Sequence, residues 1–146
     1  MTLEDWLKNK WIKSHETSPR EIADLFDVVD RDLHDAASES ISPDWRLNIA
    51  FNAALQCGMI ALHASGYRAS GEGHHERVIN SLKLTIGASD TIIRQLNRLR
   101  QKRVTNTYDA AGSVSDQEVS EAIDFAEKLR KTVRDWLAAQ HPGLLE

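Results

Sequence analysis

A basic stretch that ends at Arg103 holds the residues of this sequence best suited to chemistry. Just before it, Ile92, Leu96 and Leu99 follow one another at steps of four and three, and the next step of four reaches Arg103. Arg103 is therefore expected on the core-facing side of a helix. Because a buried guanidinium is costly unless it meets an acceptor, this arginine either binds an anion in a cleft or is held in a satisfied ion pair.

Five positive charges lie close together in a chain whose net charge is −4. They are Arg94, Arg98, Arg100, Lys102 and Arg103. Such a concentration could attract RNA phosphates or an acidic protein, since local potential rather than net charge governs encounter. The other interpretation, which we favour for the stripe considered alone, is a solvated helix face. No aromatic residue is interleaved with the stripe before Tyr108, which argues against a surface that stacks single-stranded bases.

His74 and His75 are adjacent imidazoles at the predicted start of a helix. Their side chains are expected to diverge, and no His-x-x-x-His or Glu-x-x-His partner lies nearby, so we predict loop-to-helix polar residues rather than metal ligands.

The only cysteine, Cys57, lies in an apolar run and is expected to be a buried, inert thiol. We expect no metal and no other cofactor.

Helix-start signals predict the elements that must position these residues. N-cap residues stand at Thr2, Ser18, Ser42 and Ser115, and Glu21 occupies the capping-box position after the second of them. The predicted helices cover about residues 2–13, 18–40, 42–65 and 74–84, with a longer helix from about 88 and a final one over 115–141. Residues 66–73, with three glycines, are predicted to form a loop, and it lacks the lysine of a standard phosphate-binding loop.

Composition agrees with a compact helical fold. Hydrophobic residues make up 41% of the 146 residues and charged residues 27%, which are globular values. We predict an all-α fold, an antiparallel up-and-down bundle of four to five main helices plus a short N-terminal helix, in a single domain over residues 1–146. The N-terminus has no signal-peptide pattern and no segment approaches the length of a membrane span, so a cytoplasmic location without membrane contact is expected.

Three stretches carry a resemblance to a known family. They are Ala50-Phe-Asn-Ala-Ala-Leu through Gly-Tyr-Arg68, then Gly71-Glu-Gly-His-His-Glu-Arg77, then Leu99-Arg-Gln-Lys-Arg-Val-Thr-Asn-Thr-Tyr-Asp109 followed by Val114-Ser-Asp-Gln-Glu-Val119. Together they resemble the HEPN domain, a helical module of higher eukaryotes and prokaryotes that is often encoded beside small nucleotidyltransferases in bacteria. The resemblance covers roughly residues 45–137.

The resemblance implies an antiparallel, commonly dimeric bundle whose cleft cuts RNA in active members. Those members carry an arginine and then, after four to six residues, a histidine, with two copies facing each other across the dimer. Here Arg103 matches the arginine, whereas Tyr108 stands where the histidine is expected and the next histidine is His141. Because an unperturbed phenol has a pKa of about 10, it is poorly suited to proton transfer at neutral pH, which argues against nuclease activity.

We therefore expect a HEPN-like homodimer that binds RNA, a nucleotide or a protein partner without nuclease catalysis. The expected role is that of an accessory in a toxin–antitoxin or nucleotidyltransferase system, with a nucleotidyltransferase-type protein as partner. The candidate positions are Arg103 and Tyr108 for catalysis, and Arg98, Arg100, Lys102, Asn106, His74 and His75 for binding. One alternative is a metal-independent endoribonuclease toxin that uses Arg103 with Tyr108, His74 or His75. The other is a structural dimer in which Arg103 and Tyr108 tie helices together.

Overall fold

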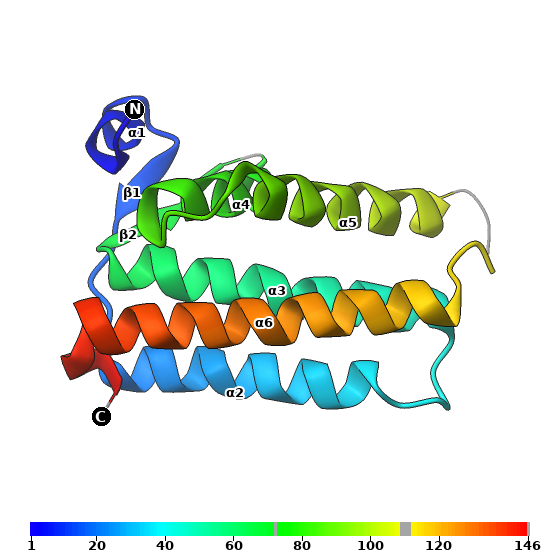
Figure 1. Ribbon diagram of the computed structural model, residues 1–146. Coiled ribbons are helices and arrows are strands. Elements are labelled where there is room, and N and C mark those ends of the chain that lie inside the picture. Colours follow the sequence, from blue (N-terminus) through cyan, green and yellow to red (C-terminus); the bar gives the residue numbers. More distant parts are fainter. Residues whose placement is uncertain (72, 109–111, 146) are drawn as a thin grey trace.

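Four long helices run along one axis, and consecutive members of this set point in opposite directions (Figure 1). The structure is a computed structural model, and it describes the chain except residues 72, 109–111 and 146 and the side chains of residues 104–108. In chain order the elements are α1 (Leu3–Lys8), β1 (Ile12–Ser14), α2 (Pro19–Ala36), α3 (Pro43–Ala64), β2 (Tyr67–Ala69), α4 (His74–Thr85), α5 (Asp90–Tyr108), α6 (Asp116–Gln140) and the 3₁₀ turn η1 (Pro142–Leu145). The all-α prediction is confirmed, and the assignment of the chain to a single domain stays a prediction.

The central element is α3, which packs against α2, α4, α5 and α6. Twelve of its 22 residues are buried, and they point to several sides of the helix, as expected for an element surrounded by others. Gly58 is a point of close contact with α4, because a Cβ atom there would lie 2.9 Å from Cγ1 of Val78. The small residue therefore sets how near α4 can come to α3.

The apolar character of α3 corrects one expectation. By length and composition alone this helix is long enough to cross a membrane, although we predicted that no segment approaches that length. In the structure, 67% of the apolar 18-residue stretch of α3 is buried inside the bundle. The core helix of a soluble protein can have the same length and apolar composition. The cytoplasmic location stays a prediction.

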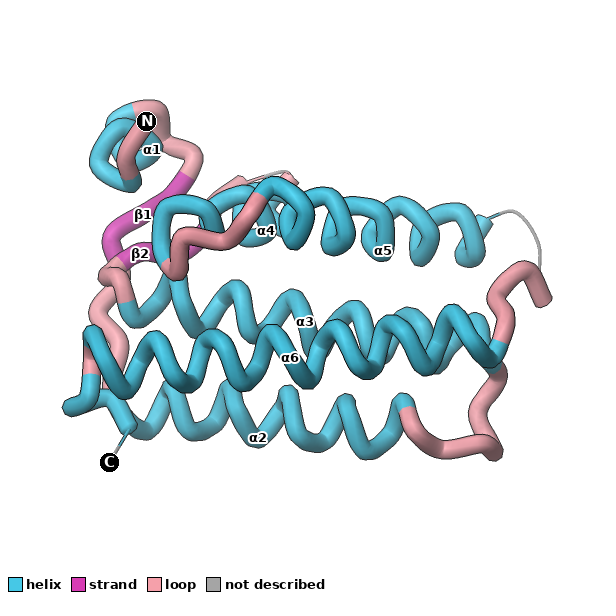
Figure 2. Tube along the Cα trace, in the orientation of Figure 1, coloured by secondary structure: helices cyan, strands magenta, loops and turns pink. Residues whose placement is uncertain are grey.

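The N-terminal segment differs most from prediction. The helix expected over residues 2–13 ends at Lys8, and Lys10 turns the chain with a φ of 62°. The following strand β1 pairs antiparallel with β2, with Ile12 opposite Ala69, and Figure 2 shows this ribbon at the end of the bundle where α1 lies. The prediction was wrong because a strand of three residues depends on a partner far along the chain, which local periodicity does not reveal.

The second helix is also shorter than predicted, ending at Ala36 rather than near residue 40. The residues that follow include Ser38 and Ser40, whose hydroxyl oxygens lie 2.9 Å apart. Serine side chains that bond locally compete with the helix, and the connection then leads to the N-cap Ser42 before Pro43. The starts of α1, α2, α3 and α6 agree with the predicted N-caps, and α4 begins at His74 as predicted.

Candidate functional site

Arg103 lies on the side of α5 that faces α3. Leu96, two turns earlier on the same side, is fully buried. The guanidinium carbon of Arg103 lies 5.1 Å from the centroid of the Phe51 ring, and its Nε atom is buried. The side chain as a whole is partly buried, so the structure places Arg103 where its spacing in the sequence predicts.

The start of α4 brings two imidazoles to the same place. The ring centroid of His75 lies 6.3 Å from that of Phe51, in an edge-to-face arrangement, so one aromatic ring neighbours both His75 and Arg103. The ring of His74 lies 4.3 Å from that of His75. The prediction that these two side chains diverge was wrong, because at the first residues of a helix no preceding turn restricts their rotamers.

Arg100 completes this group of side chains. It is partly buried, its Nη2 atom lies 4.0 Å from Oε1 of Glu76, and its Nε atom donates to Oδ1 of Asn97 at 3.4 Å. Asn97 in turn donates to Asn80 of α4, which ties the two helices together. We call the following set the histidine–arginine patch: Phe51, His74, His75, Arg100 and Arg103.

Burial and the positive charge of the patch together set the charge of His75. Burial lowers the pKa of His75 below its usual value of 6.5, and the positive charges of His74, Arg103 and Arg100 lower it further. His75 is therefore a neutral imidazole at pH 7, with a nitrogen lone pair that can accept a proton. An anion entering the patch would meet two guanidinium groups and would favour protonation of the imidazole.

Two of the remaining basic residues, Arg98 and Lys102, lie on a different side of α5. Arg98 and Lys102 line a groove of about 200 Å³ between α5 and α6, together with Leu47, Gln95, Leu99, Glu118, Glu121, Ala122 and Phe125. In that groove the Nζ atom of Lys102 lies 3.5 Å from a carboxylate oxygen of Glu118 and donates to the carbonyl of Ser113 at 3.3 Å. Four of the five charges that appear continuous in the sequence are thus divided between two surfaces, and the fifth, Arg94, is exposed and donates to Thr91.

Two of the predicted site residues lie at the end of α5. The backbone helix continues through Asn106 to Tyr108, but both side chains lie outside the described residues. The roles that we expected for Asn106 in binding and for Tyr108 in catalysis stay predictions. Among the described side chains, the structure brings together His74, His75, Arg100 and Arg103 and separates them from Arg98 and Lys102.

Comparison with known proteins gives one match. A family model described as the HEPN domain matches residues 22–136, a range that includes the complete histidine–arginine patch. No curated protein and no solved structure matches the chain.

Proposed function

Because the chain belongs to the HEPN domain family, we propose that it binds RNA and that the histidine–arginine patch receives a phosphate of the RNA backbone. The observation that carries this proposal is the shared contact of Phe51 with Arg103 and His75. It holds a guanidinium and a neutral imidazole on one surface, where the same anion can reach both.

The physical chemistry of the patch suits a phosphate. A guanidinium presents several N–H donors in a planar fork that matches two phosphate oxygens, and partial burial strengthens such charge-assisted bonds. Contact between Arg103 and the Phe51 ring limits the motion of the guanidinium, so less freedom is lost on binding. Arg100, one turn before Arg103, adds a second positive charge, and its weak 4.0 Å pairing with Glu76 leaves that charge only partly compensated.

A second candidate function, metal-independent endonuclease activity, is favoured by the neutral state of His75. In that reaction His75 accepts the proton of a ribose 2′-hydroxyl, the 2′-oxygen forms a bond to phosphorus, and the bond from phosphorus to the 5′-oxygen breaks. The leaving 5′-oxygen takes a proton from His74 or water, and Arg103 neutralises charge on the phosphate oxygens. Binding without cleavage is our primary proposal, because Tyr108 occupies the position of the histidine expected in the family.

We also propose that the protein is a cytoplasmic homodimer and an accessory of a toxin–antitoxin or nucleotidyltransferase system. The dimer and the accessory role rest on the family membership alone. Sedimentation equilibrium would give the oligomeric state, and co-purification with a nucleotidyltransferase encoded beside the gene would test the partnership.

The deciding experiment compares binding and cleavage of a mixed RNA pool, with cations chelated throughout. Arg103→Ala should weaken RNA binding about tenfold or more, since it removes a desolvated phosphate contact. Arg94→Ala is the matched control, because Arg94 is an exposed arginine on the same helix whose side chain donates to Thr91.

Three outcomes separate the candidates. Binding without cleavage, lost selectively in Arg103→Ala, supports the primary proposal. Cleavage that disappears in both Arg103→Ala and His75→Asn supports the endonuclease. Equal binding by the wild type, Arg103→Ala and Arg94→Ala would exclude the patch as the RNA site.

A further inference from the structure

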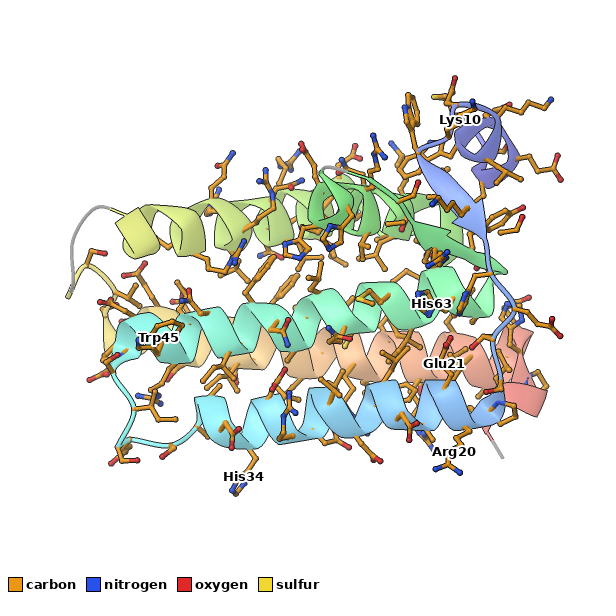
Figure 3. All side chains as sticks on the ribbon, turned by 180° about the vertical axis from the view of Figure 1, so that it is seen from behind. Lys10, Arg20, Glu21, His34, Trp45 and His63 are labelled. Atoms are coloured by element: carbon orange, nitrogen blue, oxygen red, sulfur yellow. The ribbon has the colours of Figure 1, made fainter. Side chains whose placement is uncertain are left out.

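A second cluster of polar side chains lies away from the histidine–arginine patch, where three elements meet. His15 follows the last residue of β1, Glu21 is in the first turn of α2, and His63 is in the last turn of α3. Figure 3 shows Glu21 and His63 at the same end of the bundle, on neighbouring helices. Their separations in the sequence gave no recognisable pattern, and we had expected no metal site.

The three side chains converge on one carboxylate oxygen. Nε2 of His15 lies 2.7 Å from Oε1 of Glu21, and Nδ1 of His63 lies 3.0 Å from the same atom. All three ligand atoms lie within 4.8 Å of one another, and the two imidazole ring centroids are 4.4 Å apart. The two imidazole nitrogens therefore point at the same carboxylate oxygen instead of at separate partners.

The backbone and a neighbouring hydroxyl hold this arrangement in place. The backbone N–H of His15 donates to the carbonyl of Gly66 at 2.8 Å, which fixes it to the end of the β1–β2 ribbon. Oγ1 of Thr17 donates to Oε1 of Glu21 at 2.8 Å, so the carboxylate has an oriented support. Supports of this kind orient the ligands of metal sites in proteins.

The conformation of Glu21 is the clearest indication that the cluster is specific. In α1 and α6 the acidic residue at the third helical position accepts a hydrogen bond from the backbone of its own N-cap, Thr2 or Ser115. Glu21 occupies the same position after Ser18, and Ser18 does cap its backbone N–H. The Glu21 carboxylate nevertheless turns to the two imidazoles, so the capping box predicted for α2 is only half formed.

We propose that His15, Glu21 and His63 form a binding site for a divalent transition-metal ion, with zinc as the best-matched ion. Two imidazole nitrogens and one carboxylate oxygen are a donor set that zinc prefers, and three protein ligands leave a fourth position for water or an anion. Ligand atoms around a tetrahedral zinc lie about 3.3 Å apart, which follows from bonds of about 2.0–2.1 Å. The present separations from Oε1 of Glu21, 2.7 and 3.0 Å, are shorter than that spacing, and the two nitrogens lie within 4.8 Å of each other, so the side chains would rotate to receive the ion.

Protonation in the cluster is compatible with the ion. Burial raises the pKa of Glu21, but hydrogen bonds from His15, Thr17 and His63 outweigh it and lower the pKa to about 2, so the carboxylate is charged at neutral pH. Burial lowers the pKa of His63, which keeps that ring neutral.

The site is also open to solvent. The side chains of His15, Glu21 and His63 are 21%, 34% and 13% exposed, so an ion can reach them without unfolding. An ion bound there would join the β1–β2 ribbon to the ends of α2 and α3. It would stabilise the folded chain by mass action, because the unfolded chain does not hold the three ligands together.

The test is titration of the metal-free, untagged full chain with Zn²⁺ by calorimetry and with Co²⁺ by visible absorption. We expect one ion per chain, tetrahedral Co²⁺ absorption and a raised Tm with Zn²⁺. Glu21→Gln and His63→Asn should each weaken binding at least tenfold. The matched control is His34→Asn, because His34 is an exposed histidine on α2 (Figure 3).

Circular dichroism of each variant distinguishes loss of the site from loss of the fold. Glu21→Gln keeps a side-chain oxygen for the hydrogen bonds of His15 and Thr17, so the variant should remain folded while losing the ion. Absence of binding at millimolar Zn²⁺, or binding that is unchanged in both Glu21→Gln and His63→Asn, would overturn the proposal. So would binding that is lost in His34→Asn.

Discussion

Phe51 of α3 lies beneath the guanidinium of Arg103 from α5, with 5.1 Å between the guanidinium carbon and the ring centroid. The contact joins the apolar core to the arginine that we propose to bind phosphate. A change at Phe51 should therefore affect both stability and binding.

Replacing Phe51 with leucine should lower the free energy of unfolding by about 1–3 kcal/mol, since ring contacts and the cation–π interaction are lost together. RNA binding should weaken several-fold, as measured by fluorescence anisotropy. The control is Phe26→Leu, because Arg130 lies over the Phe26 ring at the same 5.1 Å, away from the patch. Similar destabilisation with unchanged RNA binding is expected there, and equal loss of binding in both variants would contradict a local role for Phe51.

RNA affinity should increase as the pH falls from about 7.5 to about 5.5. His75 is neutral at the upper pH because burial and the neighbouring positive charges lower its pKa, and a bound phosphate would favour its protonated form. His75→Asn should flatten this dependence. An unchanged pH profile in the variant would assign the titration to another group.

A fall in pH should have the opposite effect on the stability of the RNA-free protein, and the same residue, His75, is responsible. Its pKa in the folded state lies below the unfolded value of 6.5, so its contribution to stability is complete above that pH. That contribution is lost as the pH falls through the folded pKa. Ligand-free protein should therefore become less stable in the pH range where RNA binds more tightly.

Asn52→Ala should lower the free energy of unfolding by about 1–3 kcal/mol, because it removes a partner of a buried carboxylate. Nδ2 of Asn52 donates to Asp32 at 2.6 Å, and Asp32 is only 5% exposed, with Arg31 bonded to its other oxygen. Urea unfolding would measure the change. The control is Asp24→Ala. Asp24 is an exposed carboxylate on α2, the helix of Asp32, and its replacement should change the free energy of unfolding by less than about 0.5 kcal/mol.

The thiol of Cys57 should not react with a thiol reagent in the folded protein. Burial raises the pKa of Cys57 to about 12, so the reactive thiolate does not form at neutral pH. The side chain also has no exposed surface, so a reagent cannot reach the sulfur atom. Rapid modification should begin only when denaturant unfolds α3. Fast reaction of the native protein would contradict the packing described for this helix.

Local rules were sufficient for much of the fold. Ser18, Ser42 and Ser115 cap the helices that they were predicted to start, since a cap depends on residues three or four positions away. The position of Arg103 toward the core follows from the same local periodicity, which counts only a few turns of one helix. Both predictions concern the surroundings of one element.

Contacts between different helices and strands could not be predicted from these local patterns. The β1–β2 ribbon pairs Ile12 with Ala69, and the cluster at Glu21 joins residues from a strand end and two helices. The contact of His75 with Phe51 also depends on where α4 begins above α3. A single sequence records the chemistry of these residues but not the distances between elements, which packing determines.

The groove between α5 and α6 also indicates which helices separate first when the protein partly unfolds. Because α3 is covered on several sides, its amide protons should exchange with solvent only through global unfolding. The pair formed by α4 and α5 is attached to the rest of the bundle chiefly through α3, with the groove on its other flank. This pair should separate from the bundle at a lower free energy than α3 unfolds. The histidine–arginine patch has residues on α3, α4 and α5, so it would lie at the boundary where this pair of helices separates from α3.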